Sequence, residues 1–193
     1  MNTYRAIVIG GSAGSFPIVT KLLGALPKTY KLPIVLALHR LKHVPGGFAE
    51  ALSYKSALPV EEPKDKQKMR GGTAYLAPAN YHLMVEQVGH SFALSTEEMV
   101  KFSRPSIDVL FETAAYNYRQ HLVGILLSGA NTDGVAGLKR IKDRGGLTIV
   151  QNPEECAIKT MTEGAIKADA VQKVMSTAEI SQFLNAMNNA HVY

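Results

Sequence analysis

The fold is decided near the start of the chain, by the stretch Ala6-Ile7-Val8-Ile9-Gly10-Gly11-Ser12-Ala13-Gly14-Ser15. Its first four residues are apolar without interruption, a pattern typical of a parallel strand that is buried on both faces. The glycines that follow permit a tight turn, and residues 16–26 carry apolar positions at the three- and four-residue spacing of a helix. Strand, glycine turn and helix in this order are the opening unit of an α/β fold.

The same alternation continues through the rest of the chain. Strand-like apolar runs occupy residues 4–9, 34–38, 73–77, 81–88, 121–127 and 147–150, and helical spacing marks residues 16–26, 46–58, 105–118, 134–144 and 178–189. Residues 75–88 and 90–94 are close-set strands with little helix between them, which predicts an antiparallel hairpin or edge. We therefore expect one domain over residues 1–193, with a doubly wound, mostly parallel sheet sandwiched between helices and an antiparallel hairpin or edge.

Composition places the chain among ordinary globular proteins. Of its 193 residues 46% are hydrophobic and 19% are charged, which excludes disordered, collagen-like and low-complexity classes. The single cysteine, Cys156, cannot form an internal disulfide, and no Cys/His cluster has zinc-finger spacing, so we expect a reducing compartment and a small buried thiol. The apolar run at the start is too short for a signal peptide or a membrane span, so the sequence predicts a soluble, cytoplasmic protein.

Positive charge is concentrated in one part of the chain. The formal net charge is +5, and residues 28–70 hold nine Lys or Arg against four Asp or Glu. Such a local excess suits an acidic partner surface, but it also fits a solvated basic loop such as residues 64–68. Neither aromatic interleaving nor a reading module accompanies the charge, so nucleic-acid binding is not predicted.

The turn that contains Ser12 has several chemical interpretations. The dinucleotide pattern G-x-G-x-x-G fails, because Ser12 stands at the third position from Gly10. The pattern G-x-S-x-G does fit Gly10 to Gly14, and in it a sharp turn holds the serine exposed as a nucleophile. The alternatives are a turn that only closes the angle between strand and helix, and a helix N-terminus that binds a phosphate.

Two further polar residues follow buried strands. His39 comes directly after residues 34–38, and Asp133 lies in the glycine-containing turn after residues 121–127. Because catalytic groups in an open parallel sheet gather beyond the carboxyl ends of its strands, we expect both side chains near Ser12. The three residue types then have the roles of a catalytic triad, although an aspartate so close to a helix start is also a common capping residue. The other histidines lack comparable placement and are interpreted as structural: His43, His82, His90, His121 and His191.

Five stretches of the chain, taken in order, match the pattern of one known family. They are residues 6–15, residues 39–48, residues 72–78 with 81–83, residues 104–111 and residues 129–137. These stretches resemble the catalytic domain of the CheB-type protein-glutamate methylesterases of bacterial chemotaxis. The resemblance spans nearly the whole chain, and five ordered matches are far more specific than any one motif.

The resemblance implies a serine hydrolase that removes methyl esters from glutamate side chains of chemoreceptors and releases methanol. In some family members the same site also deamidates receptor glutamines. Ser12 would be the nucleophile, His39 its general base and Asp133 the acid that orients the imidazole. The turns around the oxyanion would be formed by Ala13, Gly14, Gly129 and Ala130.

The resemblance implies neither a cofactor nor a metal. The expected partners are the methylated cytoplasmic helices of a chemoreceptor, which the basic stretch 28–70 would help to dock, and a separate receiver domain or another regulator. Nucleic acid and direct membrane insertion are not expected. Typical members carry an N-terminal receiver domain, whereas this sequence starts at the catalytic strand, so a stand-alone enzyme, a fragment of a longer protein and regulation by a separate partner all remain open.

The chain departs from the family's pattern beside the expected site. Ala13-Gly14-Ser15 stands where Thr-Gly-Gly is common, Gly129-Ala130-Asn131 stands where Gly-Met-Gly is usual, and residues 156–162 lack the usual Gly-Met-Pro. A displaced oxyanion donor at Ala130 would lower the rate and leave the triad intact. The alternative function is therefore a catalytically weakened binding or signalling module of the same fold, and a second rival is a nucleotide- or phosphate-binding protein.

Overall fold

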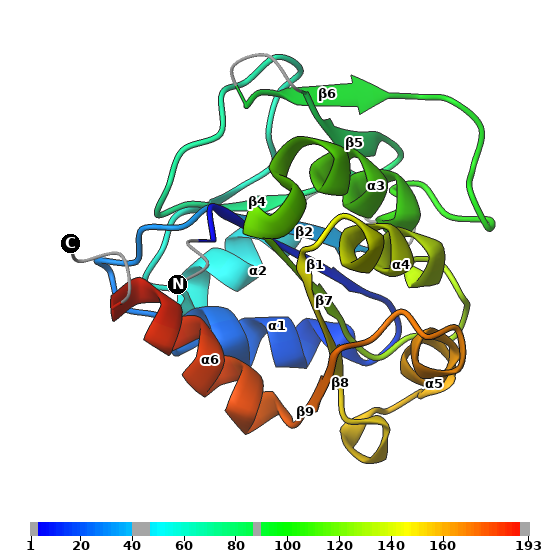
Figure 1. Ribbon diagram of the computed structural model, residues 1–193. Coiled ribbons are helices and arrows are strands. Elements are labelled where there is room, and N and C mark those ends of the chain that lie inside the picture. Colours follow the sequence, from blue (N-terminus) through cyan, green and yellow to red (C-terminus); the bar gives the residue numbers. More distant parts are fainter. Residues whose placement is uncertain (1–3, 40–46, 87–89, 190–193) are drawn as a thin grey trace.

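The computed structural model describes residues 4–39, 47–86 and 90–189. Within these ranges a parallel sheet of seven strands forms the centre of the molecule (Figure 1). In sheet order its strands are β3 (Val60–Glu61), β4 (Ala74–Leu76), β2 (Ile34–Leu38), β1 (Ala6–Gly11), β7 (Leu122–Leu126), β8 (Leu147–Gln151) and β9 (Lys173–Met175). Every neighbouring pair in this sheet is parallel, so the predicted mostly parallel, doubly wound architecture is confirmed.

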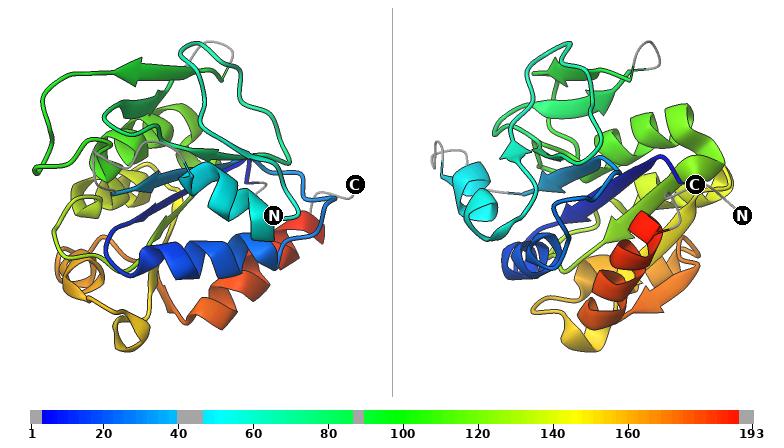
Figure 2. Two further views of the ribbon diagram at one scale, coloured as in Figure 1. Left: turned by 180° about the vertical axis from the view of Figure 1, so that it is seen from behind. Right: turned by 90° about the vertical axis from the view of Figure 1, so that its left-hand side faces the viewer.

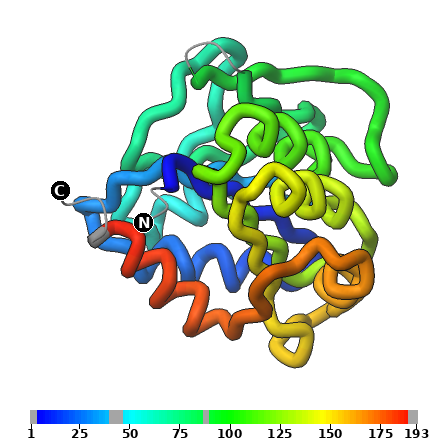
Figure 3. The backbone as a smooth tube through the Cα atoms, in the orientation of Figure 1, coloured from blue at the N-terminus to red at the C-terminus, as the bar shows by residue number. Residues whose placement is uncertain are grey.

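Helices cover both faces of the sheet, as the two outer layers in Figure 2 show. One face carries α1 (Ser15–Gly24), α2 (Phe48–Lys55) and α6 (Thr177–Asn189), and the other carries α3 (Ile107–Tyr118), α4 (Val135–Asp143) and α5 (Thr160–Lys167). The backbone tube in Figure 3 makes it plain that α1 and α6, from opposite ends of the chain, run side by side. A parallel sheet covered in this way must be apolar on both sides, which explains the uninterrupted hydrophobic runs.

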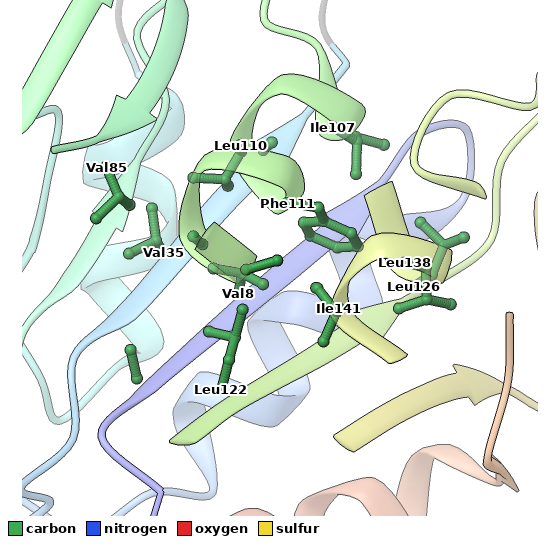
Figure 4. Close-up of a cluster of buried hydrophobic side chains, with 14 of the residues drawn as sticks. Val8, Val35, Val85, Ile107, Leu110, Phe111, Leu122, Leu126, Leu138 and Ile141 are labelled. Carbon is green, nitrogen blue, oxygen red and sulfur yellow. The ribbon is translucent and has the colours of Figure 1, made fainter. Parts of the chain in front are cut away.

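Successive residues of the central strands belong to two separate cores. Ile7 and Ile9 of β1 pack toward α1 and α6, whereas Val8 packs toward α3 and α4. Val8, Val35 and Phe111 belong to the core between the sheet and the helices α3 and α4, as the close-up in Figure 4 shows. This alternation follows from the two-residue period of a strand, and it fixes the register of the sheet, because a shift by one residue would exchange the two sets.

A separate antiparallel hairpin lies above α3. Its strands are β5 (His82–Val85) and β6 (Phe92–Ser95), which pair with Leu83 opposite Leu94. The prediction that residues 75–94 form a hairpin or edge is thus correct for the hairpin, which makes its own sheet and packs on α3 instead of extending the main sheet. The first strand of that stretch, β4, belongs to the main sheet and is parallel to β2.

Three short elements escaped prediction. They are the two edge strands β3 and β9 and the helix α5, which has eight residues. The two strands have two and three residues, too few to show an alternating pattern, and α5 carries only three buried positions, Met161, Thr162 and Ala165. Across the described parts of the chain, no helix is long and apolar enough to cross a membrane.

Candidate active site

The backbone of Ser12 is fixed at the carboxyl end of β1. Its N–H donates to the carbonyl oxygen of Ser128 at 2.9 Å, and its own carbonyl oxygen accepts the N–H and the hydroxyl of Ser15 at 3.0 and 2.6 Å. Gly14, with φ +82°, then turns the chain into α1. A side chain there would be strained, and its Cβ would lie 2.5 Å from that of Ala157. The turn therefore fixes the main chain of Ser12 and leaves its half-buried side chain just beyond the carboxyl end of β1.

Ser128, at the end of the neighbouring strand β7, ties this turn to a segment far away in the sequence. Its buried hydroxyl lies 2.8 Å from the carbonyl oxygen of Ala13 and 3.0 Å from that of Ile158. The Ile158 N–H donates back to the same hydroxyl at 3.0 Å. No role for Ser128 could be predicted from the sequence, because its local pattern does not show which loops its side chain connects.

His39 occupies the position expected from its place after β2. Gly11 pairs with Leu38, and the His39 N–H donates to the Gly11 carbonyl oxygen at 3.1 Å, so Ser12 and His39 each follow directly on adjacent strand ends. His39 Nε2 lies 2.7 Å from Asp133 Oδ2. Because Asp133 accepts, Nε2 must carry the hydrogen, and in the neutral ring Nδ1 is the acceptor. The structure contains no hydrogen bond between the described side chains of Ser12 and His39.

Asp133 is fully buried and accepts four hydrogen bonds. Its Oδ2 accepts from His39 Nε2 and from the Ile107 N–H, both at 2.7 Å, and its Oδ1 accepts from the Ser106 hydroxyl at 2.9 Å and the Asp108 N–H at 3.0 Å. Burial on its own raises the pKa of this carboxyl. The hydrogen bonds from His39, Ile107 and Asp108 outweigh it, so the pKa of Asp133 lies below its ordinary value and the group is a carboxylate at neutral pH.

Asp133 does cap a helix, but not the one that follows it. Its carboxylate binds the first turn of α3, while the first turn of α4 is bound by Asp108, whose Oδ1 accepts the N–H groups of Gly134 and Gly137 at 2.9 and 2.7 Å. Asp108 Oδ2 pairs with Lys101 Nζ at 2.7 Å. Asp133, which precedes α4, thus binds the N-terminus of α3, and Asp108, in α3, binds the N-terminus of α4. These reciprocal contacts hold the two helix N-termini together. Asp108 and Ser106 were missed as site residues, although the run Ser106-Ile107-Asp108 at a helix start is a visible capping signal.

The turns around Ser12 contain unused hydrogen-bond donors. Within the described part of the chain, the backbone N–H groups of Ala13, Gly14 and Ala130 have no acceptor. Gly129 differs, because its N–H donates to the Ile158 carbonyl oxygen at 3.0 Å. Gly129 instead provides room: a Cβ at this position would lie 3.0 Å from Ser12 Cβ and 2.5 Å from Met161 Cε.

His82 and Cys156 lie outside the predicted triad, and the sequence predicts a structural role for both. His82 is buried, accepts the Ser106 N–H at Nδ1 (3.2 Å) and contacts the Glu98 carbonyl oxygen through Nε2 (2.9 Å), so it supports the start of α3 as a structural residue. Cys156 was expected to be buried but is half-buried; this partial burial raises the pKa of its thiol, which lies 3.5 Å from the Asn152 carbonyl oxygen. His43 and His191 lie outside the described residues, and no group of three or more potential metal ligands occurs among those described.

The basic stretch 28–70 does not gather around Ser12. Lys31 precedes β2, and the Gly72 N–H, two residues after Arg70, donates to the Leu32 carbonyl oxygen at 3.3 Å. These positions lie at the amino ends of β2 and β4, whereas Ser12 lies at the carboxyl end of β1. The ammonium group of Lys66 pairs with Glu86 of the hairpin region, and residues 40–46 lie outside the described ranges.

Comparison with known proteins agrees with this arrangement. A family model described as CheB methylesterase matches residues 7–184. The chain belongs to the CheB methylesterase family. The crystal structure of the Thermotoga maritima CheB methylesterase catalytic domain superposes with a TM-score of 0.91 at 27% sequence identity, covering 95% of this chain and 98% of that one. The family predicted from five ordered stretches is therefore confirmed.

Relatives of the family differ in how much of their length this chain covers. A Leptospira interrogans protein is 42% identical over 179 residues, which are 93% of this chain and 92% of that protein. Its name is "Putative protein-glutamate methylesterase/protein-glutamine glutaminase". A Pseudomonas aeruginosa relative, 36% identical over 177 residues, is named protein-glutamate methylesterase/protein-glutamine glutaminase 3. The match covers 92% of this chain but 52% of that relative, so the chain spans about half of its length.

Proposed function

We propose that this chain is a serine hydrolase that removes methyl groups from γ-glutamyl methyl esters of chemoreceptors. The observation that carries the proposal is the 2.7 Å contact of His39 Nε2 with the buried Asp133 carboxylate, one strand away from Ser12. Membership of the CheB methylesterase family supports the substrate class. The second activity in the relatives' names, glutamine deamidation, uses the same acyl chemistry with ammonia in place of methanol as the leaving group.

The mechanism begins with attack of Ser12 Oγ on the ester carbonyl carbon. His39 Nδ1 accepts the serine proton, because Nε2 is engaged by Asp133. Collapse of the tetrahedral intermediate breaks the bond to the methoxy oxygen, which leaves as methanol with the proton from Nδ1. Water then attacks the acyl-enzyme with the same base, and the glutamate carboxylate and the Ser12 hydroxyl are regenerated. Asp133 holds the ring and stabilises the imidazolium that forms twice in each cycle.

The oxyanion of each tetrahedral intermediate requires donors that are already in place. The unused N–H groups of Ala13 and Ala130 are the proposed donors, with Gly14 beside them, while Gly129 contributes space and no donor. Ala130 replaces the side chain usual in the family but keeps the backbone N–H. The retained N–H favours an active enzyme over a binding module that has lost catalysis.

We further propose that residues 1–193 act as one domain in the cytoplasm, where the methylated helices of a chemoreceptor would be the partner. One sheet contains strands from residue 6 to residue 175, so the described chain offers no point at which to divide it. A receiver domain or another regulator would act on the edge of the sheet that carries Ser12.

Methanol release from membranes that contain methylated chemoreceptors tests the proposed function. The wild-type protein is compared with Ser12→Ala, for which a loss of up to about 10⁶-fold in kcat is expected if the three residues act as a unit. Ser181→Ala serves as a matched control, since it removes a serine hydroxyl from α6, outside the candidate site, and keeps the nucleophile. Release at equal rates from wild type and Ser12→Ala, or no release by folded wild type, would contradict the proposal.

A further inference from the structure

An exposed phenylalanine stands at the tip of a tight turn beside His39. Residues 100–103 form the turn, in which the Ser103 N–H donates to the Val100 carbonyl oxygen at 2.9 Å and the Val100 N–H donates back to Ser103 at 3.2 Å. Phe102 is 98% exposed, which is the greatest exposure among the large hydrophobic side chains described. An aromatic ring in water gains nothing for folding, so its placement needs another explanation.

The backbone of this turn is held in an unfavourable conformation. Lys101 and Phe102 are both non-glycine residues with positive φ, 48° and 62°. This left-handed region disfavours residues with a Cβ, and a bulky side chain there is uncommon. A conformation of this kind persists only where the surrounding contacts impose it, and it is a recurring feature of functional sites.

Two side chains of this turn contact the candidate active site. Lys101 Nζ binds the Thr132 carbonyl oxygen at 2.8 Å and Asp108 Oδ2 at 2.7 Å, and both partners flank Asp133 in space or in sequence. Ser103 Oγ lies 3.4 Å from His39 Nδ1, the nitrogen that receives the proton in the proposed mechanism. Phe102 is the next residue, so its Cα lies about 3.8 Å from that of Ser103. Phe102 therefore follows Lys101 and precedes Ser103, the two residues of this turn whose side chains contact the surroundings of Asp133 and His39.

A second exposed apolar side chain borders Ser12 from the other direction. Ile158 is 38% exposed, and its backbone binds Ser128 and Gly129, which follow β7. The sheet order places β1 between β2 and β7, so Ser12 lies between the strand end of His39 and that of Ser128. The turn of Phe102 is thus tied to the His39 side of Ser12, and the backbone of Ile158 is tied to its Ser128 side.

We propose that Phe102 and Ile158 bind apolar side chains of the protein substrate on either side of the methyl ester, and that Phe102 is the stronger of the two contacts. This inference rests on the proposed function and adds the residues that select a polypeptide over a small ester. Large aromatic side chains dominate binding energy at protein interfaces. A side chain on a backbone that is already fixed loses less conformational entropy on binding. The substrate residues that meet Phe102 are apolar, since the ring has no polar atom.

The test distinguishes the effect of the Phe102 ring from the effect of the backbone conformation of its turn. Phe102→Asn removes the ring with a residue that tolerates positive φ, and Phe102→Tyr retains the ring. Tyr54→Ala is the matched control, because Tyr54 is 88% exposed near the end of α2, where the Lys55 carbonyl oxygen approaches Gly24 at the far end of α1. Each variant is assayed for methanol release from methylated chemoreceptor membranes and for the rate at which diisopropyl fluorophosphate labels Ser12.

For Phe102→Asn we expect kcat/KM on the receptor to fall about tenfold, mainly through KM, as for a single interfacial aromatic. Its labelling rate should match that of the wild type, Phe102→Tyr should restore receptor activity, and Tyr54→Ala should change neither readout. Unchanged kcat/KM in Phe102→Asn would overturn the inference and leave the proposed function standing. An equal loss in receptor activity and labelling would overturn it too, because the turn would then support the active site alone. If the wild type shows no Ser12-dependent methanol release, the proposed function fails and this inference fails with it.

Discussion

The two ends of the candidate active site are built in opposite ways. Asp133 is fully buried, accepts four hydrogen bonds and joins α3 to His39. Ser12 is half-buried, and within the described residues its own turn and the turn after β7 leave three backbone N–H groups without acceptors. The acid end is saturated with protein contacts, and the nucleophile end is kept open.

This difference teaches which part of a catalytic site also serves stability. A group that never touches substrate can be enclosed and shared with the fold, so Asp133 acts at the same time as helix cap and as orienting acid. Groups that meet the ester must keep donors and space available, and such unpaired donors contribute nothing to folding. The comparison therefore predicts that changes at Asp133 affect both stability and activity, whereas changes at Ser12 affect activity alone.

Asp133→Asn should give the largest effect on rate of the changes that keep Ser12. The amide cannot hold His39 as the carboxylate does, and we expect kcat for methanol release to fall about 10⁴-fold, the size known for triads that lose their acid. The measurement is steady-state methanol release, with circular dichroism to establish folding. A loss of only a few-fold would show that Asp133 is a cap and not part of the catalytic unit.

Asp133→Ala should give the largest effect on stability. It leaves the Ser106 hydroxyl and the N–H groups of Ile107 and Asp108 without their acceptor, for a loss of about 3–5 kcal/mol in the free energy of unfolding. Ser12→Ala should stay within about 0.5 kcal/mol of the wild type, because no other residue in the described ranges forms a hydrogen bond with its hydroxyl. Urea denaturation of both variants decides the matter, and equal losses would refute the proposed division between the two ends.

Gly129→Ala should lower activity while the triad residues remain. The new Cβ would lie 2.5 Å from the flexible end of Met161 and 3.0 Å from Ser12 Cβ, so Met161 must move and Ser12 is displaced slightly. We expect about a tenfold drop in kcat, less than the roughly 10²-fold cost of moving a reacting group by 1 Å. Gly164→Ala, in the nearby helix α5, is the control: its Cβ would meet nothing closer than 3.6 Å, and activity should be unchanged. The expectation fails if both variants have wild-type rates.

The pH dependence of stability gives the smallest and most specific effect. The pKa of Asp133 is lowered from 3.8 in the folded protein, so the unfolded chain takes up its proton first as the pH falls. The stabilisation is therefore complete above about pH 5 and is lost as the pH falls through the lowered folded pKa. The difference in unfolding free energy between wild type and Asp133→Asn should shrink between about pH 5 and about pH 3. A difference that stayed constant over this range would contradict the lowered pKa.

Much of the fold could be predicted because its central strands are long apolar runs. Residues 34–38 were predicted with the bounds that β2 has, and the strand that became β1 was found two residues early. The edge strands β3 and β9 could not be found, because two or three residues carry no period and their pairing depends on distant neighbours. The hairpin was predicted from alternation, but its location above α3 depends on packing that no local pattern contains.

The candidate site was predictable where polar residues follow a strand, either directly or in the next turn. Ser12 and His39 follow directly on β1 and β2, and Asp133 lies in the turn after β7. The structure places all three beyond the carboxyl ends of these strands, and their roles remain predictions. Ser106 and Asp108 contact Asp133 from α3, more than twenty residues away, and Lys101 approaches through a turn with two positive φ angles. Such contacts arise from tertiary structure, so periodicity could not reveal them.

The central claim is that His39, held by Asp133, activates Ser12. The most direct test is the rate at which diisopropyl fluorophosphate labels the wild type and His39→Gln, with the modified residue located by peptide mass spectrometry. We predict one adduct, on Ser12, that forms at least about 10²-fold more slowly in His39→Gln, the usual contribution of a general base. Equal labelling rates in the two proteins, or an adduct on another residue, would contradict the claim.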